Sequence, residues 1–130
     1  MKGMVWMLVL LLGSGLSGIA TADVAVDELM AEYRAWGVET ANPEAGADLW
    51  RRTFENDRGC SGCHTADPAR TGRHLTTGKV IDPMAPSVNP ERLTDVRTIR
   101  KWLYRNCKWT LGRECTAQEK ADLLAWLRTQ

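Results

Sequence analysis

The stretch Cys60-Ser61-Gly62-Cys63-His64 decides how the rest of this 130-residue chain is interpreted. Two cysteines separated by two residues and followed directly by a histidine form the C-x-x-C-H pattern of covalent haem attachment. Thiols at this spacing can add to the two vinyl groups of one haem, and the adjacent imidazole then lies under the iron as the proximal ligand. The stretch therefore predicts one haem c, attached through Cys60 and Cys63, with His64 bound to its iron.

Two other uses of these cysteines have to be weighed. Cys60 and Cys63 can form a disulfide with each other, or they can form half of a zinc site with Cys107 and Cys115. The C-x7-C spacing of the second pair does not suit a zinc knuckle, whose cysteines are usually two to four residues apart. The pattern therefore favours haem over zinc.

The N-terminus has the three parts of a signal peptide. Lys2 precedes the apolar run Met4–Leu12, and small residues follow as far as Ala20-Thr21-Ala22. The apolar run is much shorter than the roughly 20 residues that a membrane-spanning helix needs. We therefore expect residues 1–22 to be removed and residues 23–130 to form one monohaem domain in the periplasm.

Charge excludes one class of partner. The chain has 17 basic and 16 acidic residues, and cleavage before Asp23 removes only one basic residue, so the mature domain carries no net charge. Binding to duplex DNA depends on several Lys or Arg contacts to phosphate, and no basic run is present. Nucleic acid is not expected as a partner, the domain is expected to be a monomer, and no acid–base motif assigns an enzymatic reaction.

The rest of the chain predicts an all-α fold with four helices. Turn and capping residues bound them: Gly37 stops the first, Asn42-Pro43 starts the second, and Thr116 with Glu119 forms a capping box for the last. Between Ser61 and Asn89 the chain has little periodicity, and so long a loop in a small domain needs something to wrap around. A haem would supply it. The predicted helices are 27–36, 42–55, 94–106 and 116–127.

From Asn42 to Gln130 the arrangement resembles class I cytochromes c. In that fold a glycine and an aromatic residue on the helix before the haem cross the C-terminal helix. Here Gly46 and Trp50 match Leu123 and Trp126.

The same resemblance implies a partner for the proximal histidine. In that family the carbonyl of a proline after the haem motif accepts the Nδ1–H of the histidine, which fixes the ring and tunes the iron. Pro83 or Pro86 would take this part for His64.

The loop before the last helix, Asn106–Cys115, contains no methionine and no histidine to bind the other face of the haem. Its possible ligands are Asn106, Lys108 and the two cysteines. In an oxidising compartment Cys107 and Cys115 are expected to form a disulfide, whose closure of a short loop is worth roughly 2.5 kcal/mol. On spacing alone, Asn106 fits a helix C-cap, because asparagine tolerates the left-handed conformation.

Several segments together resemble the sphaeroides haem protein family, oxygen-binding c-type cytochromes whose distal ligand is the asparagine directly before the first disulfide cysteine. The resemblance implies Asn106 as the distal iron ligand and a Cys107–Cys115 bridge, with a dihaem cytochrome c or a membrane cytochrome b as electron donor. The matching segments are Thr71-Gly, Thr77-Gly-Lys79, Pro83-Met-Ala-Pro-Ser87, Asn89-Pro, Leu93-Thr-Asp95, Lys101-Trp-Leu103, Arg105-Asn-Cys107, Gly112-Arg-Glu-Cys115-Thr and Glu119–Leu127.

An amide is a weak ligand that ferric iron can hold and ferrous iron releases, which opens a position for dioxygen, nitric oxide or carbon monoxide. The main alternative is a simple electron-transfer cytochrome with Met84 as a fixed ligand, and Lys108 or His74 could compete for the same place. A small disulfide-bonded binding module without haem is a third hypothesis. Trp109 either covers the distal pocket or holds the loop to the core, and Arg105 is a candidate partner for a haem propionate.

Overall fold

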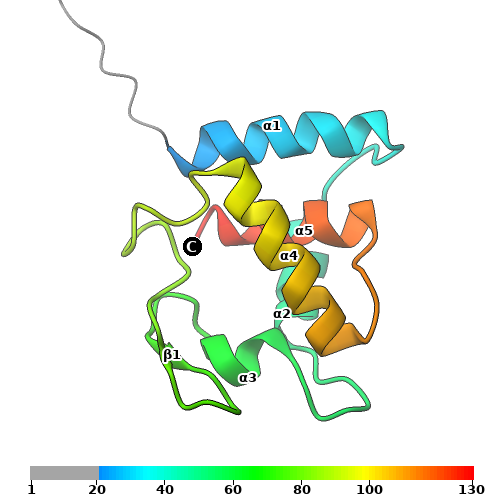
Figure 1. Cartoon of the computed structure of the whole chain (residues 1–130). Helices are drawn as coiled ribbons and strands as arrows, with labels where there is room; N and C mark the ends of the chain where they lie inside the picture. Colours follow the sequence, from blue (N-terminus) through cyan, green and yellow to red (C-terminus); the bar gives the residue numbers. More distant parts are fainter. Residues whose placement is uncertain (1–20) are drawn as a thin grey trace, which may run out of the picture.

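The computed structural model describes residues 21–130, which form five helices and one two-stranded antiparallel sheet (Figure 1). The predicted all-α class is confirmed, and the short helix α3 lies where the sequence indicated loop. None of the helices within residues 21–130 is long and apolar enough to cross a bilayer. The predicted signal peptide lies outside the described residues, apart from Thr21 and Ala22. The elements are α1 (Ala22–Ala35), α2 (Pro43–Arg51), α3 (Cys60–His64), β1 (Gly72–Arg73), β2 (Val80–Ile81), α4 (Val96–Leu111) and α5 (Ala117–Leu127).

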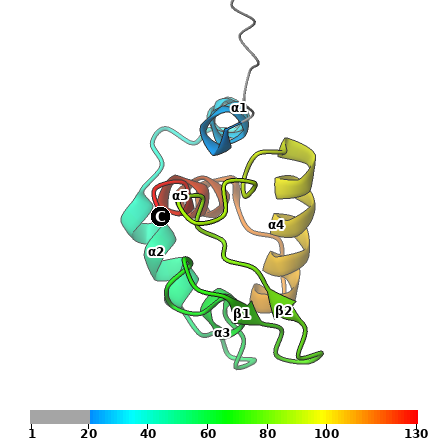
Figure 2. The same ribbon diagram turned by 90° about the vertical axis from the view of Figure 1, so that its left-hand side faces the viewer.

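Helix α1 lies across one end of α4 and α5 (Figure 2). It begins earlier than predicted, because Ala25 and Val26 extend the buried face formed by Leu29 and Tyr33 by one helical turn. It ends at the predicted place, where Gly37 takes a left-handed conformation with φ of +98°.

The crossing of α2 and α5 forms the centre of the fold, as the resemblance to class I cytochromes c implied. Gly46 lies against the backbone of Asp122, and a Cβ atom at this glycine would overlap the Asp122 carbonyl oxygen. The rings of Trp50 and Trp126 pack with their centroids 5.4 Å apart. Close approach of two helices needs a residue without a side chain at the contact, and Gly46 provides it.

Helix α2 starts as predicted and stops earlier. The Oδ1 atom of Asn42 accepts the backbone N–H groups of Glu44 (3.0 Å) and Ala45 (3.2 Å), so Asn42 is the N-cap. The helix ends at Arg51, before the predicted end at Glu55, because the chain turns back and brings Gly59 against the carbonyl of Arg52.

Helix α4 is longer than predicted at its C-terminal end. It starts after Asp95, whose Oδ1 accepts the N–H of Thr98 (2.7 Å), and it ends at Gly112 with φ of +72°. Asn106 is therefore an internal residue of α4, and its prediction as a C-cap is wrong. The glycine supplies the left-handed conformation at lower cost than asparagine.

The long loop between α3 and α4 carries the small hairpin. Gly72 pairs with Ile81 and Arg73 pairs with Val80. This loop and the helices α2, α3, α4 and α5 line the cavity that contains the candidate site.

Candidate functional site

The one-turn helix α3 presents the motif to the interior of the molecule. Cys63 is buried, Cys60 is half-buried, and both thiols are free. Gly72 of β1 packs so closely on the backbone of Cys63 and His64 that a Cβ atom there would overlap the Cys63 carbonyl. The hairpin thereby holds α3 in place.

The free thiols are in the form that covalent attachment requires. Burial raises the pKa of the Cys60 thiol to about 11, so it stays protonated at neutral pH. Within residues 21–130 no group of three or more His, Cys, Asp or Glu residues is arranged to hold a metal ion. A Cys60–Cys63 disulfide is absent from the described structure, and the second cysteine pair is bonded to itself, so half of a zinc site is not formed.

His64 is held by Trp50. The two rings pack with centroids 5.4 Å apart, and the Trp50 Nε1–H donates to the carbonyl oxygen of Thr65 (2.9 Å). Burial lowers the pKa of His64 to about 4, helped by the charges of Arg92 and His74. The imidazole is therefore neutral at pH 7, which is the form that binds metals.

The prediction of a proline carbonyl bonded to His64 is wrong for this structure. The buried Nδ1 of His64 has no hydrogen-bond partner among the described residues. The Pro83 carbonyl instead accepts from Asn89 Nδ2 (3.1 Å) and Arg92 Nε (2.9 Å), because Arg92 reaches back into the loop. Pro86 makes no such bond either.

A cavity of about 570 Å³ opens beside His64. Its size is typical of sites that enclose a cofactor, which range from roughly 300 to 1,000 Å³. Both thiols and the imidazole of α3 line it, and so do apolar residues of α2, α4 and α5, among them Leu49, Leu103 and Leu124. Two free thiols, a neutral imidazole with an unpartnered buried nitrogen and an apolar cavity of this size fit a covalently held haem.

Asn106 lines the same cavity from α4. It is half-buried, and its side-chain amide makes no hydrogen bond to any described residue. Its backbone carbonyl accepts the Thr110 hydroxyl (2.7 Å), an additional bond one helical turn away. The structure thus brings Asn106 and His64 to one cavity from two different helices, and Asn106 is held by a helix rather than by the predicted loop.

Lys108 points away from the cavity. Its Nζ donates to the Tyr104 hydroxyl (2.7 Å) and lies 4.5 Å from the centroid of that ring. The bond to Tyr104 raises the pKa of Lys108. A lysine that is exposed and paired in this way is not placed to replace Asn106.

His74 lines the cavity, but its side chain is hydrogen-bonded within its own turn. Its Nδ1 accepts the backbone N–H groups of Thr76 (3.3 Å) and Thr77 (3.2 Å), so in the neutral ring the proton lies on Nε2. Binding of iron through Nε2 requires the other tautomer, which would break both backbone bonds. Its ring packs against Trp109 at a centroid distance of 6.0 Å.

Met84 is half-buried and also lines the cavity. Its backbone N–H donates to the Pro68 carbonyl (2.8 Å), which ties this part of the loop to the segment after α3. Of the three alternative ligands Met84, Lys108 and His74, Met84 is thus the one that lines the cavity and whose side chain makes no hydrogen bond to a described residue.

Trp109 lies inside α4 and lines the cavity, so it does not hold a loop to the core. Its ring packs against His74 and against Arg58, whose Cζ lies 4.4 Å from the ring centroid. Arg58 also donates to the Trp109 carbonyl (3.2 Å). Arg105 lies over Trp102 (5.2 Å) at the cavity wall.

Arg92 is the site residue that sequence reasoning missed. Its Nε and Nη2 donate to the carbonyls of Pro83 and Asp82, each at 2.9 Å, so a cation is fixed in the cavity wall. No motif marks it, because its partners are backbone atoms that the loop brings together only when it folds.

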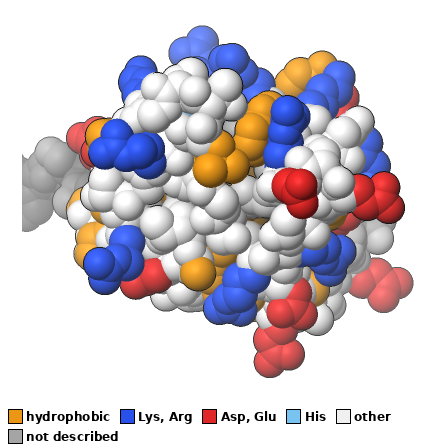
Figure 3. Space-filling model, turned by 90° about the horizontal axis from the view of Figure 1, so that it is seen from below, with side chains coloured by type: hydrophobic (Ala, Val, Ile, Leu, Met, Phe, Trp, Pro, Cys, Tyr) orange, Lys and Arg blue, Asp and Glu red, His pale blue; other side chains and the backbone are white. Residues whose placement is uncertain are grey.

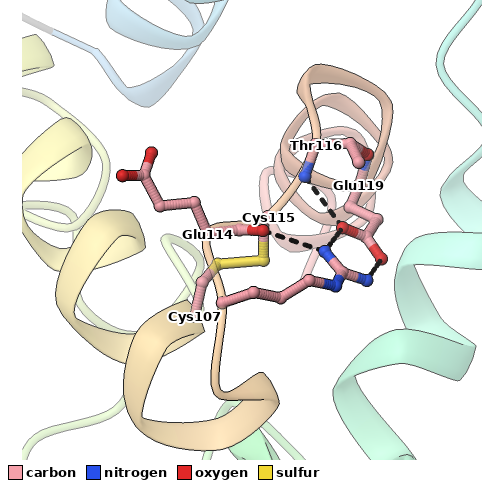
Figure 4. A network of polar contacts seen from close by, with 6 residues as sticks. Cys107, Glu114, Cys115, Thr116 and Glu119 are labelled. Atoms are coloured by element: carbon pink, nitrogen blue, oxygen red, sulfur yellow. Dashed lines mark hydrogen bonds and ion pairs between the residues drawn. A yellow bond between two sulfur atoms is a disulfide. The ribbon is translucent and has the colours of Figure 1, made fainter.

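Cys107 and Cys115 are joined by the predicted disulfide, which ties the last turn of α4 to the segment before α5 (Figure 4). Arg113, between them, forms two bonds of 2.7 Å to the carboxylate of Glu119. This ion pair, with the capping bonds to Thr116, lowers the pKa of Glu119 to about 2. The bridge and the ion pair together fix how α5 follows α4.

Comparison with known proteins adds three findings. Residues 37–127 match the family model described as a domain of unknown function, DUF1924. The chain is 44% identical over 126 residues to the cytochrome c-type protein SHP of Cereibacter sphaeroides, covering 93% of this chain and 97% of that one. It is 35% identical over 125 residues to cytochrome c'' of Methylophilus methylotrophus, covering 88% and 87%.

Solved structures give the same relatives. The structure of oxidised SHP, described as an oxygen-binding cytochrome c, superposes with a TM-score of 0.74 over 81% of this chain and 96% of that one, at 44% identity. Oxidised cytochrome c'' of Methylophilus methylotrophus gives 0.71 at 30% identity, over 84% and 94%. The solution structure of the latter concerns haem-ligand detachment and gives 0.69 at 30% identity, over 84% and 93%.

Proposed function

Because the chain belongs to the sphaeroides haem protein family of c-type cytochromes, we propose that residues 23–130 form an exported monohaem cytochrome that binds a diatomic gas. Cys60 and Cys63 hold the haem, His64 is the proximal ligand, and Asn106 is the distal ligand in the ferric state. The haem supplies an iron that, once reduced, binds dioxygen, nitric oxide or carbon monoxide.

One observation carries this proposal: the uncommitted side-chain amide of Asn106 lies in the wall of the cavity that contains His64. Asn106 can approach or leave a partner in the cavity without breaking any side-chain hydrogen bond of the fold. A neutral amide oxygen is a weak iron ligand, so Asn106 would hold ferric iron and would be released on reduction, which would leave room for a gas in the cavity beside it.

The proximal residues act by holding His64 still. Trp50 packs on its ring and is itself anchored by the bond to Thr65. Arg92 places a fixed positive charge in the same cavity wall, which helps to keep the imidazole neutral. These two residues orient His64 and set its protonation state, and neither is proposed to touch a bound gas.

The setting of the protein follows from the same proposal. The proposed electron donor is a dihaem cytochrome c or a membrane cytochrome b. The proposed location is the periplasm, after removal of residues 1–22. No acid–base group is proposed to turn the gas over.

A simple electron carrier is the second candidate, and Met84 is the observation in its favour. Its thioether is half-buried and lines the cavity, so it is placed to bind iron if the loop approaches. In that case Met84 would stay bound in both oxidation states.

Absorption and magnetic spectra of the ferric and ferrous protein distinguish the two candidates. We expect a high-spin ferrous state that binds carbon monoxide rapidly, because no ligand has to be displaced. Asn106→Ala should turn the ferric state high-spin or water-ligated and leave ferrous gas binding intact. Met84→Leu is the matched control and should change little, since the two side chains have similar volumes. A low-spin ferrous parent that becomes high-spin only in Met84→Leu would show the electron carrier instead.

A further inference from the structure

The outer side of α4 carries an unusual charge distribution. Five of its sixteen residues are Lys or Arg and none is Asp or Glu. Four of them recur at spacings of four, four and three residues, which places them along one line on the helix surface. We call this line the basic stripe of α4; it consists of Arg97, Lys101, Arg105 and Lys108.

All four residues of the stripe are exposed, and none forms a salt bridge within residues 21–130. The fifth cation, Arg100, is paired with Glu32 and does not belong to the stripe.

Two acidic residues lie near the ends of the stripe. The bonds to Thr98 lower the pKa of Asp95, with a smaller contribution from the charges of Arg97 and Lys101. The bond to Tyr104 raises the pKa of Lys108, with a smaller contribution from the charge of Glu114.

The stripe does not help the helix to fold. Like charges four residues apart repel each other and weaken a helix. The helix dipole favours a cation only near the last turn, so it accounts for Lys108 but not for Arg97 or Lys101. The repulsion between these charges is not offset by any salt bridge within residues 21–130. Unfavourable local interactions of this kind are expected at functional surfaces.

Two large aromatic side chains accompany the stripe. Trp102 is 45% exposed and Tyr104 is 47% exposed. Lys101 and Arg105 lie 5.1 and 5.2 Å from the centroid of Trp102, and Lys108 holds Tyr104. Aromatic and Arg side chains that are already ordered are the usual anchors of protein interfaces, since little side-chain entropy is lost on binding.

The surface is continuous with the candidate site. Trp102 and Arg105 are exposed and at the same time line the cavity beside His64. In the view from below, Lys and Arg side chains lie on every side of the molecule, and Asp and Glu side chains gather mainly at the right and lower right (Figure 3). The asymmetry of charge is local to α4, which has five Lys or Arg residues and no Asp or Glu, and a local surface of one charge sign orients an approaching charged partner.

We propose that the basic stripe of α4, with Trp102 and Tyr104, is the docking surface for an acidic electron-transfer protein that reduces the haem. This rests on the proposed function, which needs an electron donor. One electron leaves the reduced partner and arrives at the ferric haem, so the partner is oxidised and the cytochrome reduced by one electron, with no bond made or broken.

The chemistry of the surface favours a protein over a membrane. From Arg97 to Lys108 the stripe spans twelve residues, a length of about 16 Å for eleven steps of 1.5 Å, which suits the small interfaces of transient electron-transfer complexes. Trp102 lies both at the surface and in the wall of the cavity that would hold the haem, so a donor docked on the stripe would lie next to that cavity. Cations beside the aromatic residues complement acidic side chains on the donor.

The test uses the haem-loaded ferric protein and oxidised flavodoxin, an acidic electron-transfer protein, as the probe. With both proteins oxidised no electron is transferred, and backbone amide shifts in NMR report binding alone. We expect shifts along α4 at low ionic strength that disappear at about 0.5 M salt, where charges are screened within a few ångströms.

Variants then separate the stripe from net charge. Lys101→Glu with Lys108→Glu should weaken flavodoxin binding at least tenfold and slow reduction by flavodoxin hydroquinone to a similar extent. Arg34→Glu with Arg70→Glu makes the same change in net charge at exposed positions away from α4 and should weaken binding no more than about twofold. Trp102→Ala should weaken binding without changing charge. Three results would overturn the proposal. The two double variants could lose flavodoxin binding equally, or flavodoxin could shift amide signals outside α4. Phosphatidylglycerol vesicles could also shift the α4 signals where flavodoxin does not.

Failure of docking and failure of gas binding give different results. Carbon monoxide binding to the ferrous Lys101→Glu, Lys108→Glu variant should match that of the parent, because neither residue lines the cavity. If flavodoxin does not bind but the ferrous protein takes up carbon monoxide rapidly, only the docking surface is wrong. If flavodoxin binds along α4 and the ferrous protein stays low-spin, only the gas-binding function is wrong.

Discussion

The α-carbon of Gly46 faces the backbone carbonyl of Asp122 with no room for a methyl group between them. This contact, together with the packing of Trp50 on Trp126, joins α2, which leads into the haem motif, to α5, the last helix of the chain. Since the obstructing atoms are backbone, they cannot rotate away as a side chain would.

Gly46→Ala is therefore expected to lower the free energy of unfolding by about 3 kcal/mol, the upper part of the range for overpacked sites. Urea unfolding of the haem-loaded protein measures it. Gly62→Ala is the matched control, because its nearest neighbour is the mobile end of Leu75 at 3.4 Å, and it should change stability little. Equal stability of the two variants would contradict the role given to the crossing.

Trp50→Phe should keep a ring against His64 but remove the bond from Nε1 to the Thr65 carbonyl. We expect a loss of about 1 kcal/mol, the usual net value of one hydrogen bond, with the haem still attached. Spectra of the ferric state should broaden, because His64 is held less firmly. An unchanged stability and spectrum would mean that Thr65 needs no partner.

Cys60→Ala combined with Cys63→Ala should abolish covalent attachment. The parent protein should keep its haem through acid–acetone extraction and denaturing electrophoresis, whereas the double variant should lose it. Each single variant should keep one thioether bond and therefore its colour. Loss of all haem from the parent polypeptide would refute the haem assignment.

Removal of the Cys107–Cys115 bridge should affect stability more than ligand binding. Cys107→Ala with Cys115→Ala should lower the free energy of unfolding by roughly 2.5 kcal/mol, as expected for a short closed loop. Because Asn106 lies inside α4, it stays in the cavity wall when the bridge is cut. The ferric spectrum should thus change much less than in Asn106→Ala, and a change of the same size would contradict this.

The ion pair of Arg113 and Glu119 makes stability depend on pH. The pKa of Glu119 is lowered from 4.5 to about 2 in the folded state, so the unfolded chain takes up the proton first as pH falls. Its contribution is complete above about pH 4.5 and is lost toward pH 2.

Glu119→Gln should therefore destabilise the protein by about 1 kcal/mol at pH 7, the value of a helix cap at a largely solvated site, and by almost nothing near pH 2. Thermal unfolding over this range measures it. Glu114→Gln is the control, because its carboxylate points away from the network (Figure 4), and it should show no such pH dependence.

Local signals in the sequence were sufficient for much of this fold. The motif Cys60–His64, the Asn42 cap and the Thr116–Glu119 capping box all depend on residues a few positions apart, and the structure has the two caps as predicted. The end of α4 was misplaced because asparagine and glycine both end helices, and the choice between Asn106 and Gly112 depends on packing.

Contacts between distant parts of the chain could not be predicted in this way. Asp122 is buried in an apolar run, and its Oδ1 accepts from the backbone N–H of Asn42 and from Gln118 Nε2, both at 2.7 Å. Arg92 is held by two loop carbonyls. Neither residue has a sequence pattern, because the long-range partner of each is a backbone atom that only the folded chain brings to it.

The cavity also affects the fate of a newly made chain. An apolar cavity costs about 24 cal/mol per Å³, so leaving even half of the 570 Å³ dry costs about 7 kcal/mol, which is as large as the whole stability of a small domain. We therefore expect a chain that misses haem attachment to be far less stable than a loaded chain and more open to proteases. Degradation would then act as quality control, and the folded population that survives would consist of haem-bearing molecules.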